Sequence, residues 1–329
     1  MIRIMWGRAC YLPANFQSIS FWLTTLGCLL SWGLAGCSPV AAQAEPATKS
    51  AAAVVAPASP TMVSPATATL VSMATIAPTF SPTAPPTPAL PPAPSPTPAW
   101  VDLPAHQTLT VPILMYHHVT NVNPGTRYSV TIDNFRAQME ILQANGFTPI
   151  TIIELANVLW EGGQLPARPV VITFDDGNQD VYDHGFPILQ EFGYRAVMYV
   201  VANRLDSAGF LDAEHLMELA AAGWEIGSHG MTHANLSDAP LGINVEMYQS
   251  RILLSQNLGV EILSMAYPYT IADAKVFQKV NAYGYRAAVC AGPTNQQSLG
   301  NIYCLNRREV EGSLSLADFS RLLGLPDKP

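Results

Sequence analysis

The chain has 329 residues, of which 12% are charged, and a formal net charge of −8 at pH 7. This acidic balance excludes nucleic acid as a partner, because phosphate contacts need Lys and Arg. The length allows one large domain or two small ones. The 28 prolines are spread unevenly, so the segments of the chain are taken separately and in order.

The first segment, residues 1–37, has the pattern of an export signal. Arg3 and Arg8 give it a positive start, and a short apolar run follows and ends in Leu-Ala-Gly-Cys at Cys37. Such a run is typical of a secretory signal and is short for a membrane span. Its ending resembles the lipobox of bacterial lipoproteins. The resemblance implies a lipid on Cys37, which would attach the exported chain to the cell membrane or outer envelope, with the rest outside the cytoplasm. An uncleaved signal anchor is the alternative.

Residues 38–107 form a second segment, which consists mainly of Ala, Pro, Thr and Ser with almost no charge. It has too little apolar surface to offset the entropy of ordering, so we expect a disordered linker. Its prolines favour extended conformations, which are typical of a spacer. The remaining residues, 108–329, have the length of one domain.

The third segment alternates apolar runs with helical patterns. We expect strands at 111–119, 148–152, 170–174, 196–201, 224–227, 265–267, 287–290 and 303–305, and helices at 132–144, 154–160, 182–192, 213–222, 244–257, 272–282 and 316–323. Repeated strand–helix units predict an α/β fold with a parallel sheet. About seven parallel strands in a domain of this length favour a distorted (β/α) barrel, whose functional residues lie at the carboxyl ends of the strands.

Two adjacent carboxylates follow the expected strand at 170–174, in the sequence Thr173-Phe-Asp-Asp-Gly177. Asp175 and Asp176 would repel each other at the mouth of a barrel, and a cation would relieve that repulsion. A helix N-cap is the alternative interpretation, but it accounts for only one of the two.

Two histidines follow the expected strand at 224–227, in the sequence Ser228-His-Gly-Met-Thr-His233. Because His229 and His233 are four residues apart, a helical turn would project them to the same side, where they could share one metal. Two imidazoles, one carboxylate and a water form a catalytic zinc site. A His pair at this spacing is common by chance, but together with the paired Asp it predicts a metal site.

With these two motifs the chain resembles the polysaccharide deacetylases of carbohydrate esterase family 4, the group with the nodulation-type deacetylase domain. The resemblance covers roughly residues 111–325, and the motifs lie about fifty residues apart, as in the family. Within the family, Pro112-Ile-Leu-Met-Tyr-His-His-Val119 is most similar to the deacetylases of biofilm poly-N-acetylglucosamine.

The resemblance implies a division of roles between the motifs. Asp176, His229 and His233 would hold a divalent metal, for which zinc is the default with this ligand set. Asp175 would not be a ligand but the general base that takes a proton from the attacking water.

The third motif of the family is similar to Ala266-Tyr-Pro-Tyr269, which implies that the backbone N–H of Tyr269 donates to the oxyanion of the intermediate. Many members have Arg where this chain has Ala266, and Gly where it has Thr270. In those members the Arg orients the catalytic Asp. We expect Arg307, at the end of a late strand, to replace it, with Arg308 as the competing candidate and a surface Arg as the alternative.

Many members also carry a general acid on a C-terminal Leu-x-x-His strand, but no His follows His233 here. Ile113-Leu-Met-Tyr-His117 has a similar pattern at the start of the domain. The similarity to the biofilm subgroup implies a circularly permuted order, in which the first strand supplies this residue. We expect His117 to protonate the leaving amine, and His118 to point the opposite way if both lie on a strand. A packing role for His117 is the alternative.

Of five cysteines, only Cys290 and Cys304 lie beyond Cys37. An even pair in an exported protein permits a disulfide, and two buried thiols are the alternative.

Taken together, the sequence predicts a monomeric, metal-dependent hydrolase that removes N-acetyl groups from an N-acetylglucosamine polymer or peptidoglycan and releases acetate. An O-acetyl polysaccharide esterase would use the same machinery and is the alternative. A non-catalytic glycan-binding lipoprotein would be expected to lack a ligand or the base, whereas all four residues are present.

Overall fold

The computed structural model describes residues 99–239 and 241–326. The expected export signal, Cys37 and the linker up to residue 98 lie outside the described residues, so they stay predictions. Within the described ranges, no helix has the length and apolar character needed to cross a membrane.

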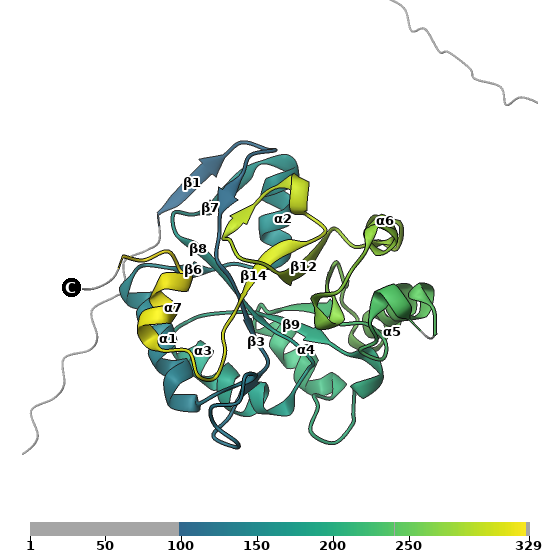
Figure 1. The fold of residues 1–329 in the computed structure, drawn as a ribbon, viewed down its shortest axis with the longest axis horizontal. Coiled ribbons are helices and arrows are strands. Elements are labelled where there is room, and N and C mark those ends of the chain that lie inside the picture. The colour runs from purple at the N-terminus through teal and green to yellow at the C-terminus, as the bar shows by residue number, and fades with distance from the viewer. Residues whose placement is uncertain (1–98, 240, 327–329) are drawn as a thin grey trace, which may run out of the picture. The chain divides into compact units, whose positions relative to one another are not determined.

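Seven parallel strands form a closed barrel, as predicted (Figure 1). Each strand is hydrogen-bonded to the next one along the chain, and the last pairs with the first. The strands are β3 (Ile113–Tyr116), β8 (Pro169–Phe174), β9 (Val197–Val200), β10 (Glu225–Ser228), β11 (Ser264–Ala266), β12 (Ala287–Ala291) and β14 (Leu305–Glu309).

The barrel is distorted around β8. At its start, β8 pairs with the short strand β6 (Thr148–Pro149), and only from Thr173 onward does it pair with β9. Near the amino ends of the barrel strands, β8 and β9 are therefore not paired, and β6 pairs with β8 there instead.

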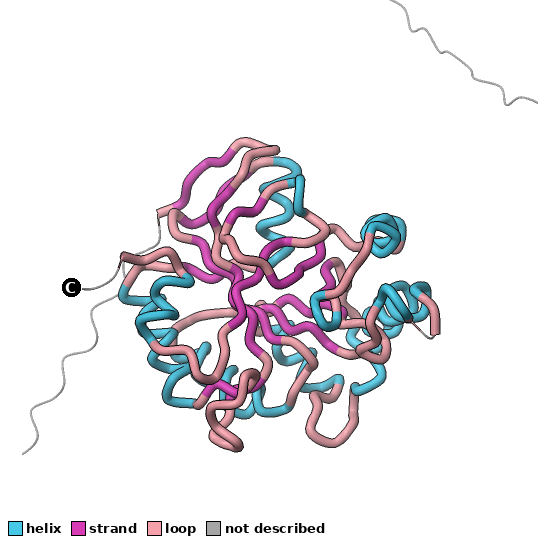
Figure 2. Tube along the Cα trace, viewed as in Figure 1, coloured by secondary structure: helices cyan, strands magenta, loops and turns pink. Residues whose placement is uncertain are grey.

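Seven α-helices of the described residues lie outside the barrel strands (Figure 2). They are α1 (Ile132–Ala144), α2 (Ile152–Glu161), α3 (Phe186–Glu191), α4 (Ala213–Ala221), α5 (Ser250–Leu258), α6 (Ala274–Ala282) and α7 (Leu316–Leu322). Local sequence determines α1 well, because the Thr131 side chain caps it and the apolar spacing buries Phe135, Met139 and Leu142. Two π-helical turns, η1 (Val181–Gly185) and η4 (Asn244–Gln249), lead into α3 and α5.

Three details differ from the sequence-based prediction. The expected strand at 111–119 is interrupted at His117, which separates β3 from β4 (His118–Val119), and β4 pairs with β5 (Ser129–Val130). The expected strand at 303–305 begins only at Leu305 and runs on through β14.

The third difference concerns the linker. Residues assigned to it form β1 (Trp100–Leu103), which pairs antiparallel with β7 (Gly163–Pro166). A further pair joins β2 (Leu109–Thr110) to β13 (Gln296–Gln297). The boundary at 107/108 was therefore placed too late, because backbone pairing with distant segments leaves no local signal.

Alternate residues of the barrel strands belong to two different cores. Ile113, Val171 and Leu305 pack together with apolar residues of α2, whereas their neighbours Leu114 and Ile172 belong to the larger core that includes the other helices. The first set therefore points into the barrel. By the same alternation, His117, Asp175 and Arg307 also point inward. They lie at the carboxyl ends of β3, β8 and β14.

Candidate active site

A cleft of about 430 Å³ lies at the carboxyl ends of the barrel strands. Its lining residues are Met115, His117, His118, Arg127, Tyr128, Asp175, Asp176, His229, His233, Tyr267, Tyr269, Thr270, Ala291 and Glu309. A larger hollow of about 900 Å³, lined among others by Phe147 and Tyr194, contains none of the predicted site residues. The smaller cleft is the candidate site because the titratable groups converge there.

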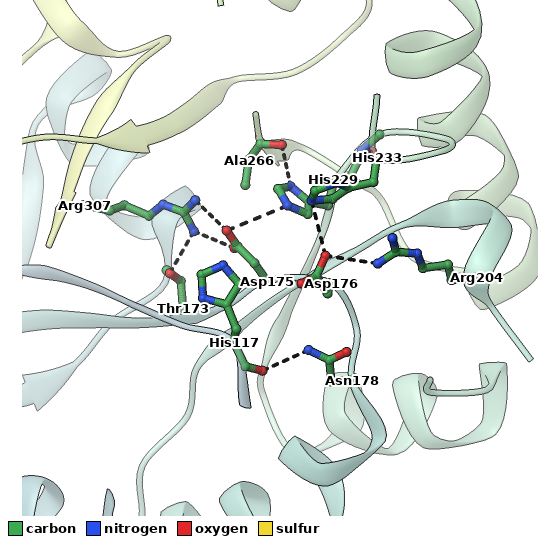
Figure 3. A network of polar contacts seen from close by, with 12 residues as sticks. His117, Thr173, Asp175, Asp176, Asn178, Arg204, His229, His233, Ala266 and Arg307 are labelled. Atoms are coloured by element: carbon green, nitrogen blue, oxygen red, sulfur yellow. Dashed lines mark hydrogen bonds and ion pairs between the residues drawn. The ribbon is translucent and has the colours of Figure 1, made fainter. Parts of the chain in front are cut away.

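Three of these side chains form a group that can hold a metal ion. One potential ligand atom from each of Asp176, His229 and His233 lies within 4.8 Å of the others. Nδ1 of His229 lies 2.8 Å from the carbonyl oxygen of Ala266, and because a carbonyl only accepts, Nδ1 carries the proton and Nε2 is free to bind (Figure 3). Two imidazole nitrogens and one carboxylate oxygen fit a divalent metal such as zinc.

Electrostatics support the same arrangement. Burial lowers the pKa of His229 and of His233, although the nearby carboxylates of Asp175 and Asp176 oppose the shift. Both imidazoles are therefore neutral near pH 7, the form that binds a metal. The guanidinium of Arg204, which follows β9, lies 3.3 Å from Oδ1 of Asp176 and partly balances the carboxylates; sequence reasoning had not singled it out.

The two histidines do not lie on a helical turn, contrary to expectation. They lie on the loop after β10, where Gly230 and His233 have φ values of 83° and 64°. Glu246, a fully buried residue of η4, holds this loop. Its carboxylate accepts the N–H groups of Met231 and Thr232, each at 2.9 Å, and the Thr232 hydroxyl at 2.6 Å.

Glu246 was missed by sequence reasoning. The only signal for it is an acidic residue between the apolar Val245 and Met247 within the predicted helix at 244–257. A buried carboxylate needs partners, but nothing local shows that these would be donors from the loop after β10.

Asp175 forms a buried ion pair with Arg307. The two guanidinium NH groups donate to its two carboxylate oxygens at 2.6 and 2.7 Å, and one of them also donates to Thr173 Oγ1 at 3.1 Å (Figure 3). Asp175 and Arg307 are only 2% and 1% exposed. Arg308, the competing candidate, is partly exposed and belongs to the outward-pointing set of β14.

This pair determines the charge of Asp175. Burial by itself would raise the pKa of the carboxyl group, but the Arg307 guanidinium and the His229 imidazole outweigh it and hold the pKa well below its ordinary value. Asp175 is therefore ionised at any pH at which the protein would work.

His117 lies beside the pair, and its ring points toward Asp175 (Figure 3). Burial lowers the pKa of His117, with Asp175 and Asp176 opposing the shift. The Asn178 side chain donates to the His117 carbonyl oxygen at 3.1 Å and fixes the backbone at the end of β3.

His118, which was expected to point the opposite way if both histidines lie on a strand, also belongs to the lining of the cleft. The strand is interrupted at His117, so simple alternation does not apply across the break. Nδ1 of His118 lies 2.8 Å from Oδ2 of Asp180, and this hydrogen bond raises the pKa of His118.

Tyr269 also lines the cleft. Its ring packs edge-on against His233, with centroids 4.6 Å apart. Its backbone φ is 59°, and its N–H has no acceptor among the described residues. Four of the seven described non-glycine residues with positive φ line this cleft: Asp176, His233, Tyr269 and Thr270. Such strained backbone gathers at functional sites.

Cys290 and Cys304 are joined by a disulfide bond, with their Cα atoms 5.0 Å apart. The bond connects the end of β12 to the segment before β14, next to the strand that carries Arg307.

Comparisons with known proteins point to one family. Residues 162–288 match the family model described as polysaccharide deacetylase. Over 224 residues the chain is 27% identical to YxkH of Bacillus subtilis (strain 168), a protein named for this same family, and the match covers 68% of this chain and 78% of that protein. The chain belongs to the polysaccharide deacetylase family.

Two further relatives of this polysaccharide deacetylase sharpen the comparison. This chain is 29% identical over 192 residues to the poly-beta-1,6-N-acetyl-D-glucosamine N-deacetylase of Staphylococcus epidermidis. The match covers 50% of this chain and 66% of that protein. The crystal structure of BC0361, a polysaccharide deacetylase from Bacillus cereus, has the same fold, with a TM-score of 0.59 and 24% identity over 66% of this chain and 69% of that chain.

Family and fold are thus confirmed for this polysaccharide deacetylase. Six predicted site residues line one cleft, and the seventh, Arg307, pairs with Asp175. Their individual roles stay predictions, as does the circularly permuted order.

Proposed function

We propose that the protein is a metal-dependent N-deacetylase, which hydrolyses the acetamide groups of an N-acetylglucosamine polymer and releases acetate. The observation that carries the proposal is the group Asp176, His229 and His233 next to the buried Asp175–Arg307 pair in one open cleft. The named substrate of the Staphylococcus epidermidis relative supports the choice of polymer.

When bound by these three side chains, a divalent cation supplies Lewis acidity for the acetyl carbonyl and the attacking water. Zinc is the proposed ion, because the donor set has two imidazoles and one carboxylate.

Asp175 is the proposed general base. Arg307 holds both of its oxygens and keeps it ionised, so the carboxylate is always able to accept a proton from the attacking water. Its low pKa means that Asp175 passes this proton on to solvent and returns to its carboxylate form, while the proton for the leaving nitrogen comes from His117.

His117 is the proposed general acid. As the bond between the acetyl carbon and the nitrogen breaks, the amine needs a proton, and the His117 ring points toward Asp175 in Figure 3. His118 is the competing acid, since it lines the same cleft and Asp180 favours its protonated form. The free N–H of Tyr269 is the proposed donor to the oxyanion that forms when water adds to the carbonyl.

We also propose that the enzyme acts outside the cytoplasm, attached through a lipid on Cys37 and separated from the membrane by the proline-rich segment. The support is the lipobox-like sequence alone. Cys37→Ser should move the enzyme from the membrane fraction to the soluble fraction without a change in acetate release, and continued membrane retention with an uncleaved N-terminus would favour a signal anchor instead.

The decisive experiment measures acetate release from N-acetylglucosamine pentamers with β-1,6 or β-1,4 linkages and, in parallel, from an O-acetylated xylan. We expect release from an N-acetylated pentamer, loss on chelation, and recovery with zinc or cobalt. Release from the O-acetylated glycan alone would make the protein an esterase, and full activity in a metal-free preparation would contradict the proposed mechanism.

A further inference from the structure

Tyr128 is an exposed aromatic residue at the edge of the active-site cleft. Its side chain lines the cleft and is 48% exposed, and it lies at the end of an exposed loop, directly before the buried strand β5. One side of its ring contacts His117, with centroids 4.6 Å apart and ring planes inclined by 55°. A large part of an apolar ring is thus left open to solvent beside the proposed general acid.

The backbone around Tyr128 is held from two sides. The Tyr128 carbonyl accepts the N–H of His118 at 3.0 Å, and the Arg127 carbonyl accepts the N–H of Gly312 at 3.1 Å. The Arg127 guanidinium donates to both carboxylate oxygens of Glu309, at 2.8 and 2.5 Å.

Close packing makes this arrangement stiff. A Cβ on Gly312 would lie 2.1 Å from the carbonyl oxygen of Ser129 and 2.3 Å from that of Thr126, so this approach requires glycine. The backbone that carries Tyr128 is therefore held in place before any ligand binds, and this lowers the entropy cost of using its ring as a contact surface.

The surroundings indicate which kind of ligand the ring suits. Glu309, Arg127 and His118 offer hydrogen-bonding groups on the same side of the cleft. A pyranose has an apolar face of C–H groups that an aromatic ring can cover and a rim of hydroxyl groups that such polar neighbours can bind. An extended apolar ligand would cover these polar groups without forming hydrogen bonds to them, which costs free energy.

We propose that Tyr128 is a platform for the pyranose ring that carries the acetamide under attack. The proposal rests on the proposed function. It places the sugar over Tyr128 because His117, which contacts this ring, is the proposed donor to the leaving nitrogen. Tyr128 would then determine affinity for the glycan and would not take part in the proton transfers.

The test uses the zinc-loaded protein and measures the binding of glucosamine pentamers, β-1,6-linked and β-1,4-linked, by calorimetry. These pentamers are products and are not turned over. Tyr128→Ala should weaken binding about tenfold or more, because the apolar contact is lost, whereas Tyr128→Phe should bind like the parent. Tyr248→Ala is the matched control, because Tyr248 is 36% exposed and does not line the cleft.

The outcomes separate this proposal from the proposed function. Unchanged pentamer affinity in Tyr128→Ala, or no binding of either pentamer to the parent, would overturn the platform. A fall in kcat without a change in affinity would make Tyr128 a positioning residue for His117 and would also overturn it. If the pentamers bind through Tyr128 but no N-acetylated glycan releases acetate, the platform stands and the proposed function fails.

Discussion

The active-site cleft is built in two different ways on its two sides. On the strand side, Asp175, His117 and Arg307 continue the inward-pointing positions of β8, β3 and β14. On the loop side, His229 and His233 follow β10 on irregular backbone with left-handed residues, and Glu246 holds the loop through three hydrogen bonds.

The difference shows two sources of precision. The regular backbone of the barrel strands orients the side chains of the strand residues, so a single ion pair completes their arrangement. Loop residues have no regular backbone to direct them, so a buried carboxylate must bind the loop from outside. We therefore expect substitutions on the strand side to affect rate and stability, and substitutions that loosen the loop to affect metal affinity.

The largest effect is expected for Asp175→Asn, the base on the strand side. It should keep the metal but lose about 10²–10⁴-fold in kcat, the usual contribution of general-base catalysis. Metal content and single-turnover acetate release should be measured on the same preparation. A near-normal rate would place the base elsewhere, and loss of metal would show that the two Asp roles are wrongly divided.

Arg307→Met should destabilise the fold by about 3–5 kcal/mol at pH 7, because it leaves the Asp175 carboxylate buried without its partner. The depressed pKa of Asp175 in the folded parent stabilises the protein above the unfolded pKa of about 3.9, and this contribution is lost as the pH falls through the folded value. The difference in unfolding free energy between parent and variant should therefore shrink on acidification.

Urea unfolding at several pH values measures this difference. The double variant Asp175→Asn/Arg307→Met is the control, since it removes both charges and should recover part of the stability. A pH-independent difference would show that packing of the Arg307 side chain, and not its charge, is what stabilises the fold.

His117→Ala should lower kcat by about 10²-fold or more while metal content stays normal, and His118→Ala should have a smaller effect. His117 acts when protonated, so activity should fall as pH rises through its pKa, and burial moves this limb to lower pH. The limb should be absent in His117→Ala. If His118→Ala is the inactive variant instead, the acid has been assigned to the wrong histidine.

Glu246→Gln tests the loop side and should have the smallest effect on the chemistry. An amide can no longer accept with both terminal atoms, so the loop carrying His233 should loosen and metal affinity should fall about 10–100-fold. Competition with a chromophoric chelator measures the affinity. At saturating metal the kcat should approach that of the parent, and an unchanged affinity would contradict the role of Glu246 in holding the loop.

Much of the fold and the outline of the site follow from local sequence. The helix at Ile132–Ala144 was predicted with its observed bounds, because capping and apolar spacing act within a few residues. The motif around Asp175 and Asp176 could be placed at the mouth of a barrel, since a buried strand precedes it and parallel strands end on one side.

The tertiary structure decided the partners. Asp175 and Arg307 lie 132 positions apart, and they meet because barrel closure places β14 beside β3 and β3 beside β8. Equally non-local contacts bring Glu246 to the loop after β10 and allow the Gly312 N–H to donate to the Arg127 carbonyl oxygen, just before Tyr128. A side chain's chemistry and its local direction depend on nearby sequence, whereas the atoms it touches depend on how distant segments pack.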